Sequence, residues 1–250
     1  MSKTTLHFSL PALLALCALA LPARAELPII AKARAYLGSE AALNAVKSVH
    51  YVGQFASANP ADKAQIAIEI VFQAPCQQRI DAKSDQGVET TALDSYDGWG
   101  RLQDKSNPPR WKLQLLGKEQ IKRLRASTWQ NLAFYRGIER TGGKLVDQGD
   151  TTADGIACRK IAFIHADDII FYRYFDRATG RLVLTESEGN LSIREEGEIV
   201  VNGVRFPKVI VNSTKQPDGS TQQIRIAFSQ ITLNENFPAS YFAIPPISPQ

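Results

Sequence analysis

The sequence predicts an α+β fold that is mainly β: a large antiparallel sheet that curls around a few helices. Apolar residues alternate with a period of two over most of the chain, and turn dipeptides ending in Gly recur between these runs. Only residues 29–47 and 118–135 have a helical pattern. These segments are too few to cover both faces of the sheet. We therefore expect them to cover its concave face and to leave an apolar pocket beneath them.

The composition is that of a globular chain with few reactive side chains. Of its 250 residues, 44% are hydrophobic and 22% are charged, which excludes a disordered or collagen-like chain. Only three Cys and three His are present, so few residues are available for metal ligation or nucleophilic catalysis. No linker-like stretch interrupts the chain after residue 25, and we predict a single domain over residues 26–250.

Residues 1–25 have the layout of a secretory signal peptide. Lys3 precedes an apolar run from Leu6 to Leu21, and Ala23-Arg24-Ala25 resembles a cleavage site of small residues. We predict export to the periplasm with cleavage after Ala25. A membrane anchor is one alternative, although the run is shorter than the roughly 20 residues of a span.

Lipidation of Cys17 is a second alternative, although the preceding Leu16 is larger than the small residue that such a site needs. Cleavage after residue 25 removes Lys3 and Arg24 and leaves 27 basic against 25 acidic residues. The weak net charge and the exported location together argue against a nucleic-acid partner.

Cleavage would leave two Cys and two His. An exported protein with Cys76 and Cys158 is a candidate for one disulfide. The alternative, which the sequence supports equally, is that both Cys are unpaired and pack as small hydrophobic side chains. His50 and His165 lie in strand-like runs, where we expect structural roles. The spacing of these four residues gives no metal site, so we expect neither a metal nor a cofactor.

The first helical segment, residues 29–47, is rich in Ala, which has the highest helix propensity. Gly38 interrupts the segment, and Ser39 restarts it as an N-cap. The expected buried stripe consists of Ile30, Leu37, Leu43 and Val46.

The clearest strand pattern covers residues 65–72. Its alternation places Ile66, Ile68, Ile70 and Phe72 on one face. We expect further strands at residues 50–55, 76–82 and 88–96, then a turn at Asp97-Gly98 and a strand from Trp99.

Asn107-Pro108-Pro109 ends this first set of strands. Residues 118–135 then contain neither Gly nor Pro and are predicted to be an amphipathic helix. One face of this helix would carry Ile121, Leu124, Thr128, Leu132 and Tyr135. The basic cluster Lys118, Lys122, Arg123 and Arg125 either is solvated or attracts anionic headgroups or an acidic partner.

After Gly142-Gly143 the chain returns to strands. We expect them at residues 156–164, 169–175, 181–186, 192–200, 204–212 and 222–231. The turns between them are predicted at Asp154-Gly155, Thr179-Gly180, Asn202-Gly203 and Asp218-Gly219. The tail beyond Phe242 is rich in Pro and is expected to be extended.

The order of these elements resembles the LolA/LolB-like superfamily, which contains periplasmic lipoprotein carriers and related lipid-binding proteins. It is similar in particular to outer membrane lipoprotein-sorting proteins. The resemblance lies in residues 35–43 (AYLGSEAAL), 46–49 (VKSV), 96–99 (YDGW), 174–182 (YFDRATGRL), 202–207 (NGVRFP), 231–234 (ITLN) and 242–245 (FAIP). It implies an incomplete β-barrel with a helical lid, which binds acyl chains of a lipid or lipoprotein in its cavity.

From this resemblance we expect a monomeric, non-enzymatic periplasmic carrier or chaperone in outer membrane lipoprotein sorting. Its partners would be the acyl chains of its cargo and membrane-associated donor or acceptor proteins. The acyl site would use the two apolar faces, and the helix would open when ligand enters. The expected cavity residues are Ile66, Ile68, Ile70, Phe72, Ile121, Leu124, Leu132 and Tyr135, and the alternative is that they form an ordinary closed core.

Two other functions stay open. The first is a periplasmic sensor domain of similar fold that binds a membrane protein, and the second is a secreted carboxylate hydrolase. A hydrolase of that kind needs two carboxylates in a polar cleft. The adjacent pairs Asp167-Asp168 and Glu195-Glu196 would point to opposite faces of a strand, and no known catalytic motif occurs, so we expect no catalytic residue.

Overall fold

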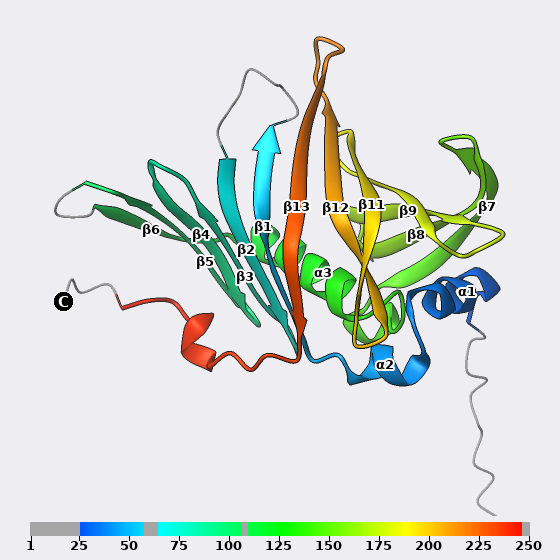
Figure 1. Ribbon diagram of the computed structural model, residues 1–250, viewed down its shortest axis with the longest axis horizontal. Helices are drawn as coiled ribbons and strands as arrows, with labels where there is room; N and C mark the ends of the chain where they lie inside the picture. The colour runs from blue at the N-terminus through cyan, green and yellow to red at the C-terminus, as the bar shows by residue number, and fades with distance from the viewer. Residues whose placement is uncertain (1–25, 58–64, 107–109, 247–250) are drawn as a thin grey trace, which may run out of the picture.

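The computed structural model describes residues 26–57, 65–106 and 110–246. The predicted signal peptide with its cleavage after Ala25, the Asn107-Pro108-Pro109 break and the last four residues lie outside this part of the chain. Within it, one sheet of 13 antiparallel strands is accompanied by three α-helices and two short 3-10 helices (Figure 1).

The helices are α1 (Pro28–Leu37), α2 (Glu40–Ala45) and α3 (Lys118–Leu132), with 3-10 turns at Ile138–Thr141 and Ala239–Tyr241. The strands before α3 are β1 (Ser48–Ser57), β2 (Gln65–Gln73), β3 (Gln77–Lys83), β4 (Gly87–Asp94), β5 (Asp97–Asp104) and β6 (Trp111–Leu115). The strands after α3 are β7 (Lys144–Ala153), β8 (Ile156–Ala166), β9 (Ile169–Asp176), β10 (Leu182–Ser187), β11 (Leu191–Val201), β12 (Val204–Lys215) and β13 (Thr221–Leu233).

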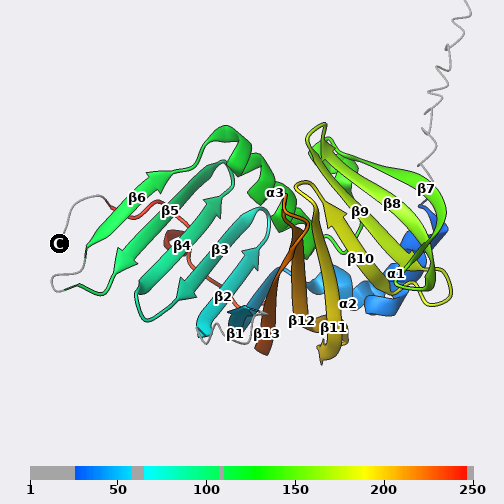
Figure 2. The ribbon, with the colours of Figure 1, turned by 90° about the horizontal axis from the view of Figure 1, so that it is seen from above.

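The sheet consists of two meanders that meet in its middle. Strands β1–β6 form one meander and β7–β13 the other, and β1 pairs with β13 where they join. Strands β6 and β7 form the two outer edges, so the sheet curls without closing on itself (Figure 2). This confirms the prediction of a mainly β fold with an incomplete, curled antiparallel sheet.

Helix α3 packs on one face of the first meander, where it contacts β1 to β5. The alternation predicted for β2 is confirmed, because Ile68, Ile70 and Phe72 pair with Gly53, Tyr51 and Val49 of β1 on this face. Helix α1 packs on the same side of the second meander, where Ile30 and Ala33 join a core cluster with Phe163 and Phe175. The helices thus cover the concave side of the sheet (Figure 2).

The C-terminal segment covers the opposite face of the first meander. The indole Nε1 of Trp99 donates a hydrogen bond to the carbonyl oxygen of Phe242 at 2.8 Å. The guanidinium of Arg79 donates to the carbonyl oxygen of Tyr241 at 2.8 Å and lies 4.4 Å from the centre of that tyrosine's ring. This half of the sheet is therefore enclosed on both faces, which the pattern of an extended tail did not predict.

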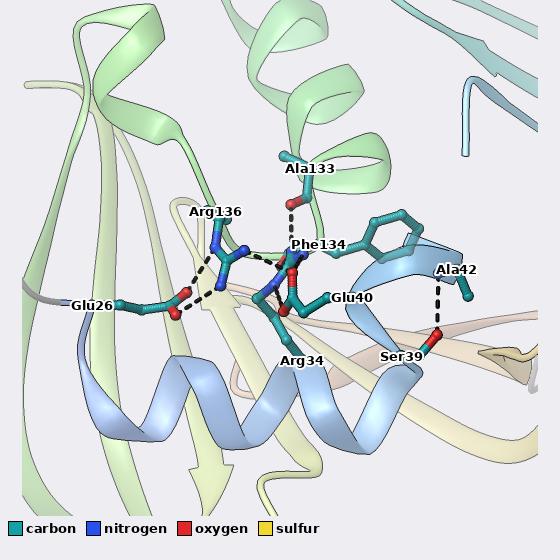
Figure 3. A network of polar contacts seen from close by, with 8 residues as sticks. All are labelled: Glu26, Arg34, Ser39, Glu40, Ala42, Ala133, Phe134 and Arg136. Atoms are coloured by element: carbon teal, nitrogen blue, oxygen red, sulfur yellow. Dashed lines mark hydrogen bonds and ion pairs between the residues drawn. The ribbon is translucent and has the colours of Figure 1, made fainter. Parts of the chain in front are cut away.

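Local signals placed several helix ends and turns correctly. The Ser39 hydroxyl accepts a hydrogen bond from the backbone amide of Ala42 at 3.2 Å, as predicted for an N-cap (Figure 3). Asp154-Gly155 and Asn202-Gly203 both have the two positive φ angles of a hairpin turn.

Gly180 has φ +81°, and a Cβ atom there would lie 2.6 Å from the carbonyl carbon of Lys32. Only glycine therefore allows the β9–β10 turn to approach helix α1 this closely. The close approach joins the second meander to the first helix of the chain.

Two expectations about the elements were wrong, and two strands were not predicted. Helix α3 ends at Leu132 rather than at residue 135, because Phe134 and Tyr135 adopt left-handed backbone conformations. The turn after β4 lies at Ser95-Tyr96, where Ser95 has φ +58°, so Asp97 and Gly98 belong to β5. Strands β6 and β7 were not predicted, since β6 has only five residues and a bulge between Asp147 and Gly149 interrupts the alternation of β7.

The proposed disulfide is not formed, because Cys76 and Cys158 are free thiols. Cys76 follows β2 in the first meander, whereas Cys158 lies in β8, near the far edge of the second. Cys158 is fully buried and packs with Tyr174 and Leu184. It behaves as the small hydrophobic side chain of the alternative prediction, and burial raises the pKa of its thiol.

Candidate functional site: a cavity between the sheet and helix α3

A cavity of about 350 Å³ lies between the sheet and the C-terminal end of α3. Strands β1, β2 and β3 line it on one side, and β9 to β13 line it on the other. The roof is formed by Ser127, Gln130 and Asn131 of α3 together with Phe134 and Tyr135 just beyond it. Its volume is within the range of small-molecule sites, and most of its lining side chains are apolar.

The cavity contains only part of the predicted acyl site. Ile70, Phe72 and Tyr135 line it. Ile68 belongs to the same core cluster as Ile70 and Phe72 but does not line the cavity, and Leu132 packs against that cluster.

Three further predicted residues lie outside the cavity lining. Ile66 lies two residues before Ile68 on β2, where it pairs with Phe55 of β1. Ile121 contacts β5 beside Gly98, and Leu124 is half-buried near the start of α3. Ile121, Thr128 and Leu132 of the predicted helix face pack towards the sheet, whereas Ser127, Gln130 and Asn131 of α3 line the cavity.

A network of arginines holds the C-terminal end of α3 in place (Figure 3). Arg34 of α1 is buried, and its Nη1 donates to the carbonyl oxygens of Phe134 at 2.7 Å and Ala133 at 3.2 Å. The carbonyl groups at a helix C-terminus have no partner within the helix. A cation at this end also interacts favourably with the helix dipole. Arg34 thus anchors the roof of the cavity to the N-terminal helices.

Glu40 at the start of α2 joins two arginines in this network. Arg34 donates to both of its carboxylate oxygens, at 2.8 and 2.7 Å, and Arg136 donates at 2.7 Å. The hydrogen bond from Arg34, followed by the nearby charges of both arginines, lowers the pKa of Glu40. Arg136 also donates to Glu26 at 3.0 and 2.8 Å, so the segment after α3 is held at two points (Figure 3).

Two ionisable side chains in the cavity were missed by sequence reasoning. Arg173 of β9 is 8% exposed, and its guanidinium carbon lies 4.8 Å from the ring centres of both Tyr135 and Phe163. Glu195 of β11 lines the same cavity, and burial raises its pKa against the opposing effect of Arg173. Arg173 shares one face of β9 with Phe171 and Phe175, because side chains two residues apart point to the same side of a strand. This spacing in the sequence could have indicated that Arg173 is buried.

A smaller pocket of about 190 Å³ adjoins the cavity and shares Tyr135, Glu195 and Phe206 with it. At this pocket the Tyr36 hydroxyl donates to the carboxylate of Glu198. Arg205 lies 5.3 Å from the ring centre of Tyr36 and 3.5 Å from the same carboxylate. Burial, followed by the hydrogen bond to Glu198, raises the pKa of Tyr36. The two pockets share lining residues, and the smaller one adds the ionisable side chains Tyr36, Arg181 and Glu198.

The basic cluster of α3 is engaged within the chain. Lys122 pairs with Glu119 at 3.0 Å, and Arg123 pairs with Glu188 at 2.7 Å. Arg125 donates to the carbonyl oxygen of Ser95 at 2.6 Å and stacks on the ring of Tyr96. These contacts support the interpretation of the cluster as a solvated, paired surface.

Glu195 and Glu196 point to opposite faces of the sheet, as the strand pattern predicts. Glu195 lines the cavity, whereas Glu196 pairs with Arg225 at 2.6 Å on the other face of the sheet. Asp167-Asp168 form the turn between β8 and β9. Among the described side chains, no three of His, Cys, Asp and Glu are placed to hold a metal ion. None of the described helices is both long and apolar enough to cross a membrane.

His165 beside the cavity provides a pH-dependent test of this packing. Burial, followed by the charge of Arg173, lowers its pKa to about 4. The unfolded chain binds a proton there near pH 6.5, so the folded state should lose stability as the pH falls from about 6.5 to about 4. We expect His165→Phe to flatten this part of the profile, because Phe fits beside Trp129 and Phe171 without titrating. Urea denaturation at a series of pH values measures the free energy of unfolding of both proteins. If it changes with pH in parallel for the unchanged protein and His165→Phe, His165 is not the group responsible.

Comparisons with known proteins place the fold. No family model matches this chain, and no curated protein matches its sequence. A protein of the DUF1329 family from Desulfovibrio piger is similar in structure, with a TM-score of 0.55 and 8% identity, over 86% of this chain and 95% of the other. A LolA superfamily protein from Nitrosomonas europaea is similar with a TM-score of 0.52 and 10% identity. The match covers 86% of this chain and 96% of that protein.

A domain described as an outer membrane lipoprotein-sorting protein from Vibrio parahaemolyticus is also similar, with a TM-score of 0.54 and 9% identity. The match covers 86% of this chain and 94% of that domain. Likeness at such low identity shows the fold alone. The curled, unclosed sheet with α3 across its concave side is the LolA-like fold.

Proposed function

We propose that the protein is a non-enzymatic periplasmic carrier or chaperone that holds an acyl chain of a lipid or lipoprotein beneath α3. The cavity carries this proposal, because its volume of about 350 Å³ and its mainly apolar walls suit a hydrocarbon chain. Each methylene group removed from water contributes about 0.8 kcal/mol to binding. The LolA-like fold supports the proposal, since the similar Vibrio domain is described as a lipoprotein-sorting protein.

Cellular location and partners are part of the same proposal. Residues 1–25 would direct export and be removed after Ala25, and residues 26–250 would act as a monomeric single domain. Membrane-associated proteins would donate the cargo or accept it, which is the arrangement needed for a role in outer membrane lipoprotein sorting. Access would require the end of α3 to move away from the sheet, because Phe134 and Tyr135 form the roof of the cavity.

The lining favours the carrier over the hydrolase. Glu195 is the carboxylate among the side chains that line the larger cavity. Glu198, in the adjoining pocket, already accepts from Tyr36 and lies 3.5 Å from Arg205. The mainly apolar walls of the larger cavity, and the engagement of Glu198 by Tyr36 and Arg205, suit the burial of a hydrocarbon chain better than hydrolysis by two carboxylates.

Native mass spectrometry of the mature protein purified from the periplasm tests the proposal. We expect a bound mass that corresponds to an acyl-chain compound. If the purified protein is ligand-free and also fails to take up lipid or lipopeptide in vitro, the proposal is wrong.

A cavity-filling substitution gives a sharper test of the same site. Ile193 lines the cavity from β11, and Ile193→Trp should occupy part of the space that an acyl chain needs. We expect uptake of a fluorescent acyl probe to weaken by about tenfold or more, since several methylene groups would lose their burial.

The matched control is Val200→Trp on the same strand, where the side chain is 61% exposed. This variant should bind the probe as the unchanged protein does. Equal binding by the unchanged protein and Ile193→Trp, with both folded by circular dichroism, would place the acyl chain elsewhere.

A further inference from the structure

The guanidinium of Arg173 is a buried charge without a hydrogen-bonding partner on two of its nitrogens. Its Nε and Nη1 have no partner among the described residues, and the side chain is 8% exposed. Burial of an ionised group without a partner is strongly unfavourable. The rings of Tyr135 and Phe163, each 4.8 Å away, offset part of that cost through cation–π contacts but accept no N–H bond.

Among the described residues, no acidic side chain accepts a hydrogen bond from the Nε or Nη1 of Arg173. Glu195 lies on the same face two strands away, and burial raises its pKa against the opposing charges of Arg173 and Arg181. His165 has its pKa lowered to about 4 and is neutral at pH 7. Burial also raises the pKa of Tyr135, so its phenol is neutral. Arginine itself keeps its proton, so Arg173 brings a positive charge to this region of the cavity.

The sheet register places hydrogen-bonding side chains in line with Arg173. Arg173 pairs with Thr185 of β10, Thr185 pairs with Ile193 of β11, and Ile193 pairs with Asn212 of β12. Thr185 and Asn212 line the same cavity and can each donate a hydrogen bond. Phe206 and Ile226 form part of the apolar wall of the cavity. An amphiphile would therefore meet a cationic group and neutral donors at one part of the site and hydrocarbon at the other.

We propose that Arg173 binds the anionic headgroup of a single-chain amphiphile whose acyl chain occupies the apolar part of the cavity. This inference rests on the proposed function and names the class of ligand. The shared chemistry is a group of anionic oxygens, either a carboxylate, as in a free fatty acid, or a phosphate. The volume of about 350 Å³ is near the lower end of the range for ligand sites, which favours one chain over several.

Binding of three probes with the same sixteen-carbon chain tests the proposal. Palmitate carries a carboxylate, hexadecyl phosphate carries a phosphate, and hexadecanol is neutral. Isothermal titration calorimetry on the mature protein at pH 7 should show that at least one anionic probe binds about tenfold or more tightly than hexadecanol. The tighter of the two anions identifies the headgroup.

Variants assign the preference to Arg173. In Arg173→Leu the preference for the anionic probe over hexadecanol should disappear, whereas Arg173→Lys should retain part of it. The matched control is Arg225→Leu, which removes the same charge from the other face of the sheet, where Arg225 pairs with Glu196. This control should leave the preference unchanged.

The outcomes separate the two proposals. If the unchanged protein binds all three probes equally, the headgroup inference is wrong and the carrier function stands. If the preference survives in a folded Arg173→Leu, another group recognises the anion and the assignment is overturned. If no probe binds, both proposals fail. Should Arg173→Leu not fold, the comparison of probes on the unchanged protein and on Arg173→Lys still decides the question.

Discussion

Arg34→Leu is expected to lower the free energy of unfolding by about 3 kcal/mol. The substitution removes the hydrogen bonds to the carbonyl oxygens of Ala133 and Phe134 and the paired contact with Glu40. The carbonyl of Phe134 would then be left in a buried site without this donor. Glu40 remains half-exposed and keeps Arg136 as a partner, which limits the loss on its side.

Thermal and urea denaturation measure this loss, and a change of about 3 kcal/mol corresponds to a decrease of roughly 6 to 12 °C in Tm for a chain of this size. Arg136→Leu is the matched control, because its side chain is exposed and exposed ion pairs contribute about 1 kcal/mol or less. Hydrogen exchange should also accelerate at the C-terminal end of α3 in Arg34→Leu. Equal stability of the two variants would show that Arg34 does not anchor the helix.

Trp99→Ala should lower the free energy of unfolding by about 4 kcal/mol, which is more than Arg34→Leu. Trp99 is 2% exposed in β5, and its indole donates to the carbonyl oxygen of Phe242. The substitution leaves a large cavity and removes the hydrogen bond that holds the C-terminal segment against the sheet. The side chain of Arg79, whose guanidinium lies 5.8 Å from the indole, would lose a packing partner as well.

Trp111→Ala is the control for the loss of one tryptophan, since Trp111 is 37% exposed on the edge strand β6. An exposed substitution of this kind usually changes stability by about 0.5 kcal/mol or less. Urea denaturation followed by circular dichroism compares the two variants without relying on tryptophan fluorescence. Similar losses in both would mean that docking of the C-terminal segment on Trp99 contributes little to stability.

Burial within the sheet could be predicted for single strands but not for the site as a whole. The alternation in β2 correctly placed Ile68, Ile70 and Phe72 on one face. Alternation identifies the residues that share a face, yet it does not distinguish a face packed against a helix from one that lines a cavity. Ile68, Ile70 and Phe72 all belong to the same core cluster, but only Ile70 and Phe72 also line the cavity, although the pattern treats the three alike.

The helix that forms the roof shows a related limit. The apolar stripe predicted over residues 118–135 packs towards the sheet, but it did not indicate that Gln130, Asn131 and Phe134 line the cavity. The left-handed residues Phe134 and Tyr135 end the helix without a Gly or Pro to mark the position. The donor that satisfies this helix end is Arg34, 100 residues away in the chain, so no local pattern could reveal it.

Local information in the sequence determined the fold class, the Ser39 cap, several hairpin turns and the apolar face of β2. These features depend on interactions between residues close in the chain, such as side-chain alternation and turn conformations. Only the tertiary structure decided which residues line the cavity and that the C-terminal segment covers Trp99. It also decided that Arg173 is buried in the cavity with no hydrogen-bonding partner for two of its nitrogens in the described part of the chain. The reason is physical: burial and charge compensation depend on distances between segments that are far apart in the sequence, and these distances exist only after the two meanders have met.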